Sequence, residues 1–193
     1  ALSVRRVATE LGVAPNALYT YVPDRVGLER AVVEHVLATV DLALLDGPAG
    51  QWRARVHRFA LALRSRLLDH PGAAALLMSA PMDGPTALEV GERLLAALED
   101  AGLASTDRAR GVWVLIVFVI GSVALDVAET DGRRPLAPEQ QRIAARRDAL
   151  SAVDAQAWPR TVAALDVQAA WVGEEQFTWG LDRILDGLAT SAR

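Results

Sequence analysis

Two short helical patterns joined by a tight turn, near the start of the chain, constrain the fold most. Val4, Val7, Ala8 and Leu11 recur at helical spacing and predict one apolar face of a first helix. Gly12 follows directly, where a helix ends most easily in the left-handed conformation that glycine tolerates. We therefore expect the first helix to stop there and the chain to turn sharply.

The second pattern begins after that turn. Ala14, Pro15 and Asn16 are predicted to open a helix, because a proline in the first turn lacks only an N–H that has no partner there. Ser3 is placed to cap the first helix by accepting a backbone hydrogen bond. Two short helices joined in this way predict a helix-turn-helix, a motif whose second helix enters the DNA major groove. A purely structural helical hairpin is the alternative.

Longer helices follow. A third helix is predicted from Asp24 to about Leu45, and roughly 20 residues span about 30 Å, enough to leave a small head and enter a second domain. Its inward stripe is predicted as Leu28, Val32, Val36 and Val40. Further helices are predicted over residues 51–69, 73–79, 84–102, 106–129, 138–150 and 173–190. Among these, Leu88 is expected to face inward and Thr106 to cap its helix.

Composition is that of an ordinary globular protein, with 52% hydrophobic and 23% charged residues. The net charge of −4 argues against a protein that coats nucleic acid over its whole surface. Residues 1–36 contain four arginines and four acidic residues, so this part is neutral. The chain has no cysteine, which excludes disulfides and thiolate metal sites. Without a signal-peptide pattern, we expect a cytoplasmic protein.

One apolar stretch raises the question of a membrane. Residues 111–125 carry no charge, but 15 residues are fewer than the roughly 20 that span a bilayer. A helix that is apolar all round is more often buried on every side. We therefore expect no membrane, and instead a helix buried between a domain core and a second subunit.

The ordered set Gly12-Val13, Leu18-Tyr19, Tyr21 and Arg25 resembles the TetR family of bacterial transcriptional regulators. A second group resembles the subclass with a tetracycline-repressor-type C-terminal domain. Its members are Asp69-His70-Pro71-Gly72, Gly84-Pro85, Leu98, Ala101-Gly102-Leu103, Gly121 and the segment from Phe177 to Gly187.

The resemblance implies an all-α protein with a helix-turn-helix DNA-binding head and linking helix over residues 1–45. A larger effector-binding and dimerisation domain is implied over residues 46–193. It also implies that the first helix of the head is missing, and we expect about 25–45 further residues before residue 1.

The resemblance further assigns roles to individual residues. DNA contacts fall on Ser3, Arg5, Pro15, Asn16, Ala17, Tyr19, Tyr21 and Arg25. Those at the start of the second helix lie nearest the base edges, while hydroxyl and guanidinium groups are suited to phosphates or guanine. Each has an ordinary alternative, such as a helix cap, a core side chain or a solvated charge.

Two more sets follow from the family pattern. An apolar ligand pocket is predicted from Phe59, Met78, Met82, Trp113, Val117, Phe118 and Trp171, although each fits an ordinary core equally well. A homodimer interface is predicted from Gly121, Phe177, Gly180, Leu181, Ile184, Gly187 and Leu188.

Signals for catalysis and metal binding are missing from the sequence. There is no GxSxG, P-loop, GxGxxG or HExxH motif, so we expect no enzyme, no catalytic residue and no cofactor. The histidines are His35, His57 and His70, and the segment after His70 offers no metal ligand. We therefore expect neither a metal site nor a tetracycline–magnesium effector.

The function expected from the resemblance is that of a ligand-responsive regulator of transcription. Its partners would be double-stranded operator DNA, a second copy of the chain and an unknown small-molecule effector. The simplest form is a repressor that leaves a palindromic operator when a small apolar molecule binds the C-terminal domain. The alternatives are an activator, a ligand-independent DNA-binding protein, or a helical small-molecule-binding module.

Overall fold

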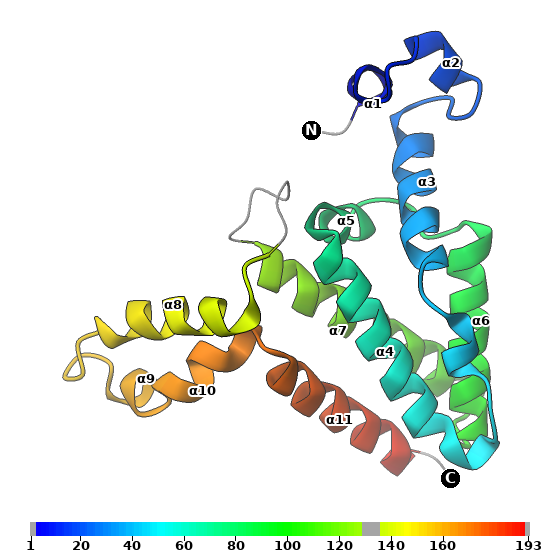
Figure 1. The fold of residues 1–193 in the computed structure, drawn as a ribbon. Coiled ribbons are helices and arrows are strands. Elements are labelled where there is room, and N and C mark those ends of the chain that lie inside the picture. The colour runs from blue at the N-terminus through cyan, green and yellow to red at the C-terminus, as the bar shows by residue number, and fades with distance from the viewer. Residues whose placement is uncertain (1–2, 129–135, 192–193) are drawn as a thin grey trace.

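The computed structural model describes residues 3–128 and 136–191, and within those ranges it contains helices and no strand (Figure 1). The predicted all-α class is thereby confirmed. The α-helices are α1 (Val4–Leu11), α2 (Pro15–Tyr19), α3 (Arg25–Ala38), α4 (Trp52–Asp69), α5 (Pro71–Leu77), α6 (Pro85–Asp100), α7 (Ser105–Val127), α8 (Glu139–Ser151), α9 (Pro159–Ala163), α10 (Leu165–Ala169) and α11 (Glu174–Ser191). Short 3-10 helices are η1 (Leu42–Leu45), η2 (Ala49–Gln51) and η3 (Ala170–Val172).

The first two helices form as the sequence predicts. The Ser3 hydroxyl oxygen accepts a hydrogen bond from the Arg6 N–H at 3.3 Å and so caps α1. Gly12 ends α1 with a φ of 67°, in the left-handed region. Pro15 is the first residue of α2. Local sequence signals therefore determine both ends of the turn.

The third helix is shorter than predicted, because α3 ends at Ala38 and not near Leu45. The Thr39 hydroxyl donates to the Val36 carbonyl oxygen at 2.7 Å, which satisfies a carbonyl in the last turn. The Asp41 carboxylate then accepts a backbone hydrogen bond at 2.9 Å at the start of η1. These hydrogen bonds of Thr39 and Asp41 end α3 earlier than the apolar pattern predicts.

The predicted inward stripe of the third helix is confirmed, with Leu28, Val36 and Val40 buried and Val32 half-buried against the core. Val33 is buried in addition, because α3 packs against both α5 and α6. Two other local predictions were wrong. Leu88 is 59% exposed on α6. Thr106 does not cap α7, which begins one residue earlier, after Ala104. Helix periodicity predicts that an apolar stripe exists, but the neighbouring helices decide which residues form it.

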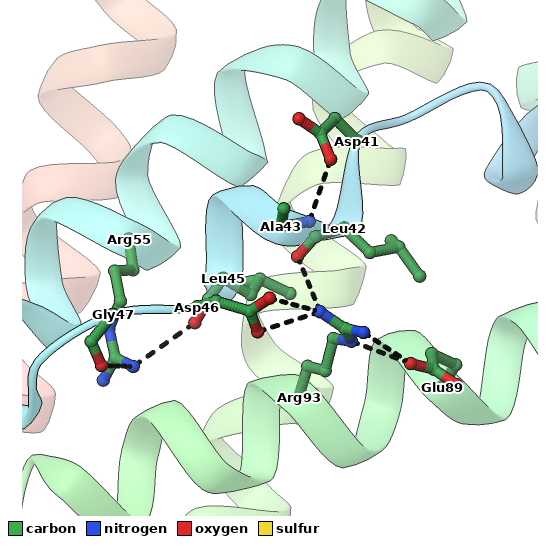
Figure 2. A network of polar contacts seen from close by, with 9 residues as sticks. All are labelled: Asp41, Leu42, Ala43, Leu45, Asp46, Gly47, Arg55, Glu89 and Arg93. Atoms are coloured by element: carbon green, nitrogen blue, oxygen red, sulfur yellow. Dashed lines mark hydrogen bonds and ion pairs between the residues drawn. The ribbon is translucent and has the colours of Figure 1, made fainter.

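Residues 39–48, which we call the linker segment, are held by two arginines of the bundle (Figure 2). Arg55 of α4 donates to the carbonyl oxygens of Leu45 and Gly47 at 3.3 and 2.9 Å. Arg93 of α6 donates to both carboxylate oxygens of Asp46 at 2.8 and 2.9 Å. The chain therefore enters the larger bundle at a fixed place.

The middle of α3 contacts the start of α6 through side chains that we call the α3–α6 contact. Arg30 donates to both carboxylate oxygens of Asp83 at 2.7 and 3.0 Å. Glu34 accepts hydrogen bonds from the N–H groups of Thr86 and Ala87 at 2.7 and 3.1 Å. The contact therefore joins one helix to the N-terminus of another.

Both carboxylates of this contact favour their charged forms. Burial raises the pKa of Glu34, but the hydrogen bonds from Thr86 and Ala87 outweigh it, so the pKa lies below the ordinary value. The hydrogen bond from Arg30 and its charge lower the pKa of Asp83. Acid is therefore expected to weaken the contact.

The core of the larger bundle is built around α7. This helix packs against α4, α5, α6 and α11, and its residues Leu115, Val119 and Val123 are buried. The fully buried leucines of the bundle are Leu67, Leu98, Leu181 and Leu185. Among the described residues α7 has the length and apolarity to cross a bilayer, with a mean hydropathy of 2.0 over its most apolar window. One side of it packs against the other helices of the bundle.

Helices α8, α9 and α10 form an arm that extends away from the bundle (Figure 1). Residues 139–151 form a helix with no buried residue, in agreement with the exposed helix predicted there. Glu139 accepts a hydrogen bond from the Glu174 N–H at 3.1 Å and thereby joins the arm to the start of α11. Part of the predicted helix over 106–129 and the loop after it lie outside the described residues.

A buried cluster of charges joins the arm to the bundle. Arg64 of α4 donates to Asp126 of α7 at 3.0 Å, and Arg142 of α8 lies 4.0 Å from the same carboxylate. Burial raises the pKa of Asp126 despite the attraction of both arginines. Arg64 also lies over the Phe177 ring, 5.3 Å from its centroid. One polar cluster therefore connects α4, α7, α8 and α11.

The lowered pKa of Glu34 gives a pH prediction. Its stabilising contribution is present above the ordinary glutamate pKa and is lost as pH falls through the lowered value in the folded protein. Glu34→Gln is expected to reduce the free energy of unfolding by about 0.3–1 kcal/mol at neutral pH, and the difference from the native protein should disappear at an acidic pH below the lowered pKa of Glu34.

Urea unfolding at the two pH values measures this difference. Glu92→Gln, at an exposed position of α6, is the control and should leave the free energy of unfolding close to that of the native protein. A deficit in Glu34→Gln that is equal at both pH values would contradict the prediction.

Candidate nucleic-acid interface and effector cavity

The helix-turn-helix is held together by a small apolar cluster of its own. Val4, Val22 and Leu28 are buried, and Val7 and Leu18 pack against them. These residues come from α1, from α2 and the turn after it, and from α3. The cluster therefore fixes the angle between α1 and α2 without using the larger core.

The start of α2 faces outward from this cluster. Pro15, Asn16 and Ala17 are all exposed. Arg5 on α1 is also exposed. Because its side chains are exposed, the first turn of α2 is available to enter a groove, as the motif requires.

The two tyrosines differ in their exposure. Tyr19 is 46% exposed and Tyr21 is 83% exposed. Tyr21 lies beyond the end of α2, in the turn that leads to α3. Its hydroxyl is therefore better placed than that of Tyr19 to donate to a phosphate oxygen.

Ser3 and Arg25, which were predicted to contact DNA, also have partners within the protein. The Ser3 oxygen accepts the cap hydrogen bond, which leaves its hydroxyl hydrogen able to donate to a phosphate. Arg25 donates from Nε to Glu29 at 2.7 Å while its side chain stays 64% exposed. At the start of α3, the Asp24 carboxylate accepts a hydrogen bond from the Gly27 N–H at 2.8 Å.

An apolar cavity of about 30 Å³ lies between α4, α6 and α7. Its lining residues are Val56, Phe59, Ala60, Leu63, Val90, Leu94, Leu115, Ile116 and Val119. Pockets for drug-sized ligands usually measure about 300–1,000 Å³, so the cavity must enlarge before it holds such a molecule.

The structure does not bring together the seven residues predicted for the pocket. Of these, Phe59 alone lines the cavity. Met78, Trp113, Val117 and Trp171 are exposed on the subunit. Met82 and Phe118 are half-buried, and the Phe118 ring stacks on Phe177 with centroids 5.1 Å apart. The sequence analysis missed the aliphatic lining because valine and leucine there look like any other core residues.

Some residues predicted for a subunit interface are buried inside the subunit, and others lie nearer its surface. Phe177 and Leu181 are buried inside the subunit, so they belong to its own core. Gly180 lies against the Phe118 ring, where a Cβ atom would come within 2.8 Å. Gly121, Ile184 and Leu188 are half-buried, while Gly187 is exposed and has open space around it.

Large apolar side chains remain exposed on the two helices where the interface was predicted. On α7 these are Trp113, Val114, Val117 and Leu125, and on α11 it is Trp179. Helices α7 and α11 contact each other. These two adjacent helices therefore present apolar side chains that the described part of the subunit does not cover.

Comparison with known families supports the helix-turn-helix interpretation. Residues 46–192 match the family described as "Tetracyclin repressor-like, C-terminal domain". A protein of Saccharopolyspora erythraea, an HTH-type transcriptional regulator, is 35% identical over 125 residues, which are 65% of this chain and 52% of that protein. The HTH-type transcriptional repressor DrrR1 of Streptomyces coeruleorubidus is 28% identical over 97% of this chain and 69% of its own length. The chain thus spans about half the length of the first relative.

Solved structures show the same fold. The TetR family protein ActR of Streptomyces coelicolor, in complex with actinorhodin, has a TM-score of 0.80 at 26% identity, covering 100% of this chain and 88% of that one. A possible TetR family transcriptional regulator from the same species has a TM-score of 0.78 at 30% identity, covering 98% and 89%. These relatives are regulators of transcription and not enzymes.

The close approach of Gly180 to Phe118 gives a prediction. In Gly180→Ala the new methyl group displaces the stacked rings of Phe118 and Phe177, and overpacking of this kind costs about 1–3 kcal/mol. Gly91→Ala, on α6 with open space around it, should be neutral or stabilising by up to about 1 kcal/mol. Thermal or urea unfolding of both variants measures the difference, and equal stability would refute the role assigned to Gly180.

Proposed function

Because the chain belongs to the TetR family of transcriptional regulators, we propose that it binds operator DNA and responds to a small molecule. We further propose that it is a repressor, as DrrR1 is described to be. The observation that carries the proposal is the exposed first turn of α2, presented by a helix-turn-helix with its own core. As a bacterial regulator of transcription it would act in the cytoplasm.

DNA contacts are proposed on the exposed side of the head. Asn16 is suited to pair with adenine and Ala17 to touch a thymine methyl group. Tyr21, Ser3 and Arg25 would contact phosphates and fix the register of α2 in the groove. The side chain of Arg25 would keep its Glu29 partner and still carry exposed donors.

A homodimer is proposed through α7 and α11. Reading two half-sites about 34–36 Å apart requires two recognition helices related by a two-fold axis. The exposed Trp113, Val117 and Trp179 would supply the apolar centre of that interface, and the exposed Gly187 leaves open space on α11. Burying these side chains against a second copy would remove apolar surface from water.

An apolar or aromatic small molecule is proposed as the effector, entering by way of the cavity between α4, α6 and α7. The cavity has an aliphatic lining with Phe59 as its aromatic member, so it would select by shape and apolarity. ActR, which has the same fold, has been crystallised with actinorhodin. The ligand would release DNA only through its different affinities for the two states of the protein.

Selection from a random duplex library at two salt concentrations tests the proposed function. We expect enrichment of a palindrome, with affinity that falls steeply as salt rises because bound phosphates release counterions. A folded protein that enriches no sequence would refute operator binding and favour a helical small-molecule-binding module.

Variants of the head sharpen this test. Tyr21→Ala and Arg25→Ala should each weaken operator binding by about tenfold, which corresponds to roughly 1.4 kcal/mol for one phosphate contact. Both side chains are exposed, so circular dichroism should show unchanged folding. Native affinity in both variants would contradict the assigned contacts.

The interface is tested by a charge placed on α7. Val117→Arg should shift the protein from dimer to monomer in analytical ultracentrifugation, since an unpaired charge would be buried against the second copy. Val167→Arg is the matched control, because Val167 is equally an exposed valine but lies on the arm, in α10. A dimer of unchanged strength in Val117→Arg would place the interface elsewhere.

A further inference from the structure

The N-terminus of α6 takes its capping acceptor from another helix. The N-cap residue of α6 is Gly84, which has no side chain to accept the free N–H groups of the first turn. The carboxylate of Glu34 on α3 accepts two of them, from Thr86 and Ala87. A side chain on α3 thus completes α6, and the two helices are joined by charge-assisted hydrogen bonds.

Gly84 leaves the space that this arrangement needs. Its φ of −80° suits any residue, so backbone strain does not require glycine here. A Cβ atom at this position would overlap the carboxyl group of Glu34. Arg30, one helical turn before Glu34, binds the neighbouring Asp83 with two hydrogen bonds. On the α6 side, the α3–α6 contact is therefore built from four of the five residues 83–87, at the start of α6 and just before it.

A second polar contact joins α6 to the chain just after α3. Arg93 holds the Asp46 carboxylate and also donates to the Leu42 carbonyl oxygen at 3.3 Å (Figure 2). Glu89, one turn earlier on α6, accepts from Arg93 Nε at 2.8 Å and orients its guanidinium group. One helix therefore holds α3 at its middle and the linker segment beyond its end.

The same helix forms one wall of the cavity. Val90 and Leu94 line the cavity, and they lie about one and two helical turns after the α3–α6 contact. A molecule that enlarges the cavity must move at least one of α4, α6 and α7. Movement of α6 would displace the partners of Arg30 and Glu34, and α3 carries the head directly.

We infer that α6 transmits the state of the cavity to the head, through the α3–α6 contact. The inference rests on the proposed function for its effector, but the mechanical coupling of α6 to α3 is a property of the fold. The competing route is the apolar packing of α3 against α5, which needs no polar contact. The two routes differ in what happens when the polar contact is removed.

The contact can be broken from the α6 side without changing α3. Asp83→Ala removes the partner of Arg30, and Gly84→Ala displaces the Glu34 carboxylate from the N–H groups of α6. Both positions lie outside the head, so the double variant leaves every proposed DNA contact intact. Gly91→Ala, in open space on the same helix, is the control.

Val90→Phe serves as the probe in place of an unidentified effector. Its ring exceeds the free space of the cavity and should push α6 outward, whereas Val90→Leu adds one methylene group and should fit. Each is made in the native chain, in Gly91→Ala and in the Asp83→Ala, Gly84→Ala variant. Hydrogen exchange of the α3 amides, followed by mass spectrometry, is the first readout.

We expect Val90→Phe to accelerate exchange in α3 in the native and Gly91→Ala backgrounds, and to have no such effect once the contact is broken. Operator affinity is the second readout. Val90→Phe should lower it by about fivefold or more in the native chain and should leave it unchanged in the Asp83→Ala, Gly84→Ala variant. An equal effect of Val90→Phe in all backgrounds would overturn the inference in favour of packing through α5.

Two further outcomes remain decisive. If Val90→Phe does not fold, the Asp83→Ala, Gly84→Ala variant alone decides, because it should change α3 exchange while Gly91→Ala does not. Equal exchange in those two variants would overturn the inference. If the native protein binds no operator, the proposed function fails, and the exchange data still show whether α6 is coupled to α3.

Discussion

The rest of the structure depends on the burial of α7. This helix is apolar over most of its length, and α4, α5, α6 and α11 pack against it. Each of those helices buries its stripe against α7, so their positions are set by one shared surface. The side of α7 that keeps Trp113 and Val117 exposed is the side proposed to contact a second copy. One helix thus organises both the core of the subunit and the surface proposed for dimerisation.

The head is organised differently, because it has its own small cluster and polar connections to the bundle. Val4, Val22 and Leu28 hold the helix-turn-helix together. Arg30 and Glu34 join α3 to α6 by hydrogen bonds, which form only when donor and acceptor are correctly oriented. Apolar packing fixes the shape of each part, and directional contacts fix how one part follows the other. A regulator needs both, because its two states must differ in arrangement and not in fold.

Much of the head was predictable from sequence because its signals are local. The Ser3 cap, the Gly12 left-handed turn and Pro15 at the first position of α2 each depend on a few neighbouring residues. The end of α3 was not predictable from its apolar pattern, because that pattern continues to Leu45 while capping by Thr39 and Asp41 stops the helix. The role of Gly84 was also hidden, since Glu34 lies about fifty positions away in the chain and meets it only in the folded protein.

Sequence by itself determined the all-helical class, the helix-turn-helix and the family, because periodicity, caps and motif spacing are properties of short segments. Only the tertiary structure decided which apolar residues are core, cavity or surface. Phe177 and Leu181 became core, and Trp113 and Val117 became surface, although the sequence predicted other roles for them. The physical reason is that a side chain's burial depends on which distant helices pack against it, and a one-dimensional pattern does not contain that information.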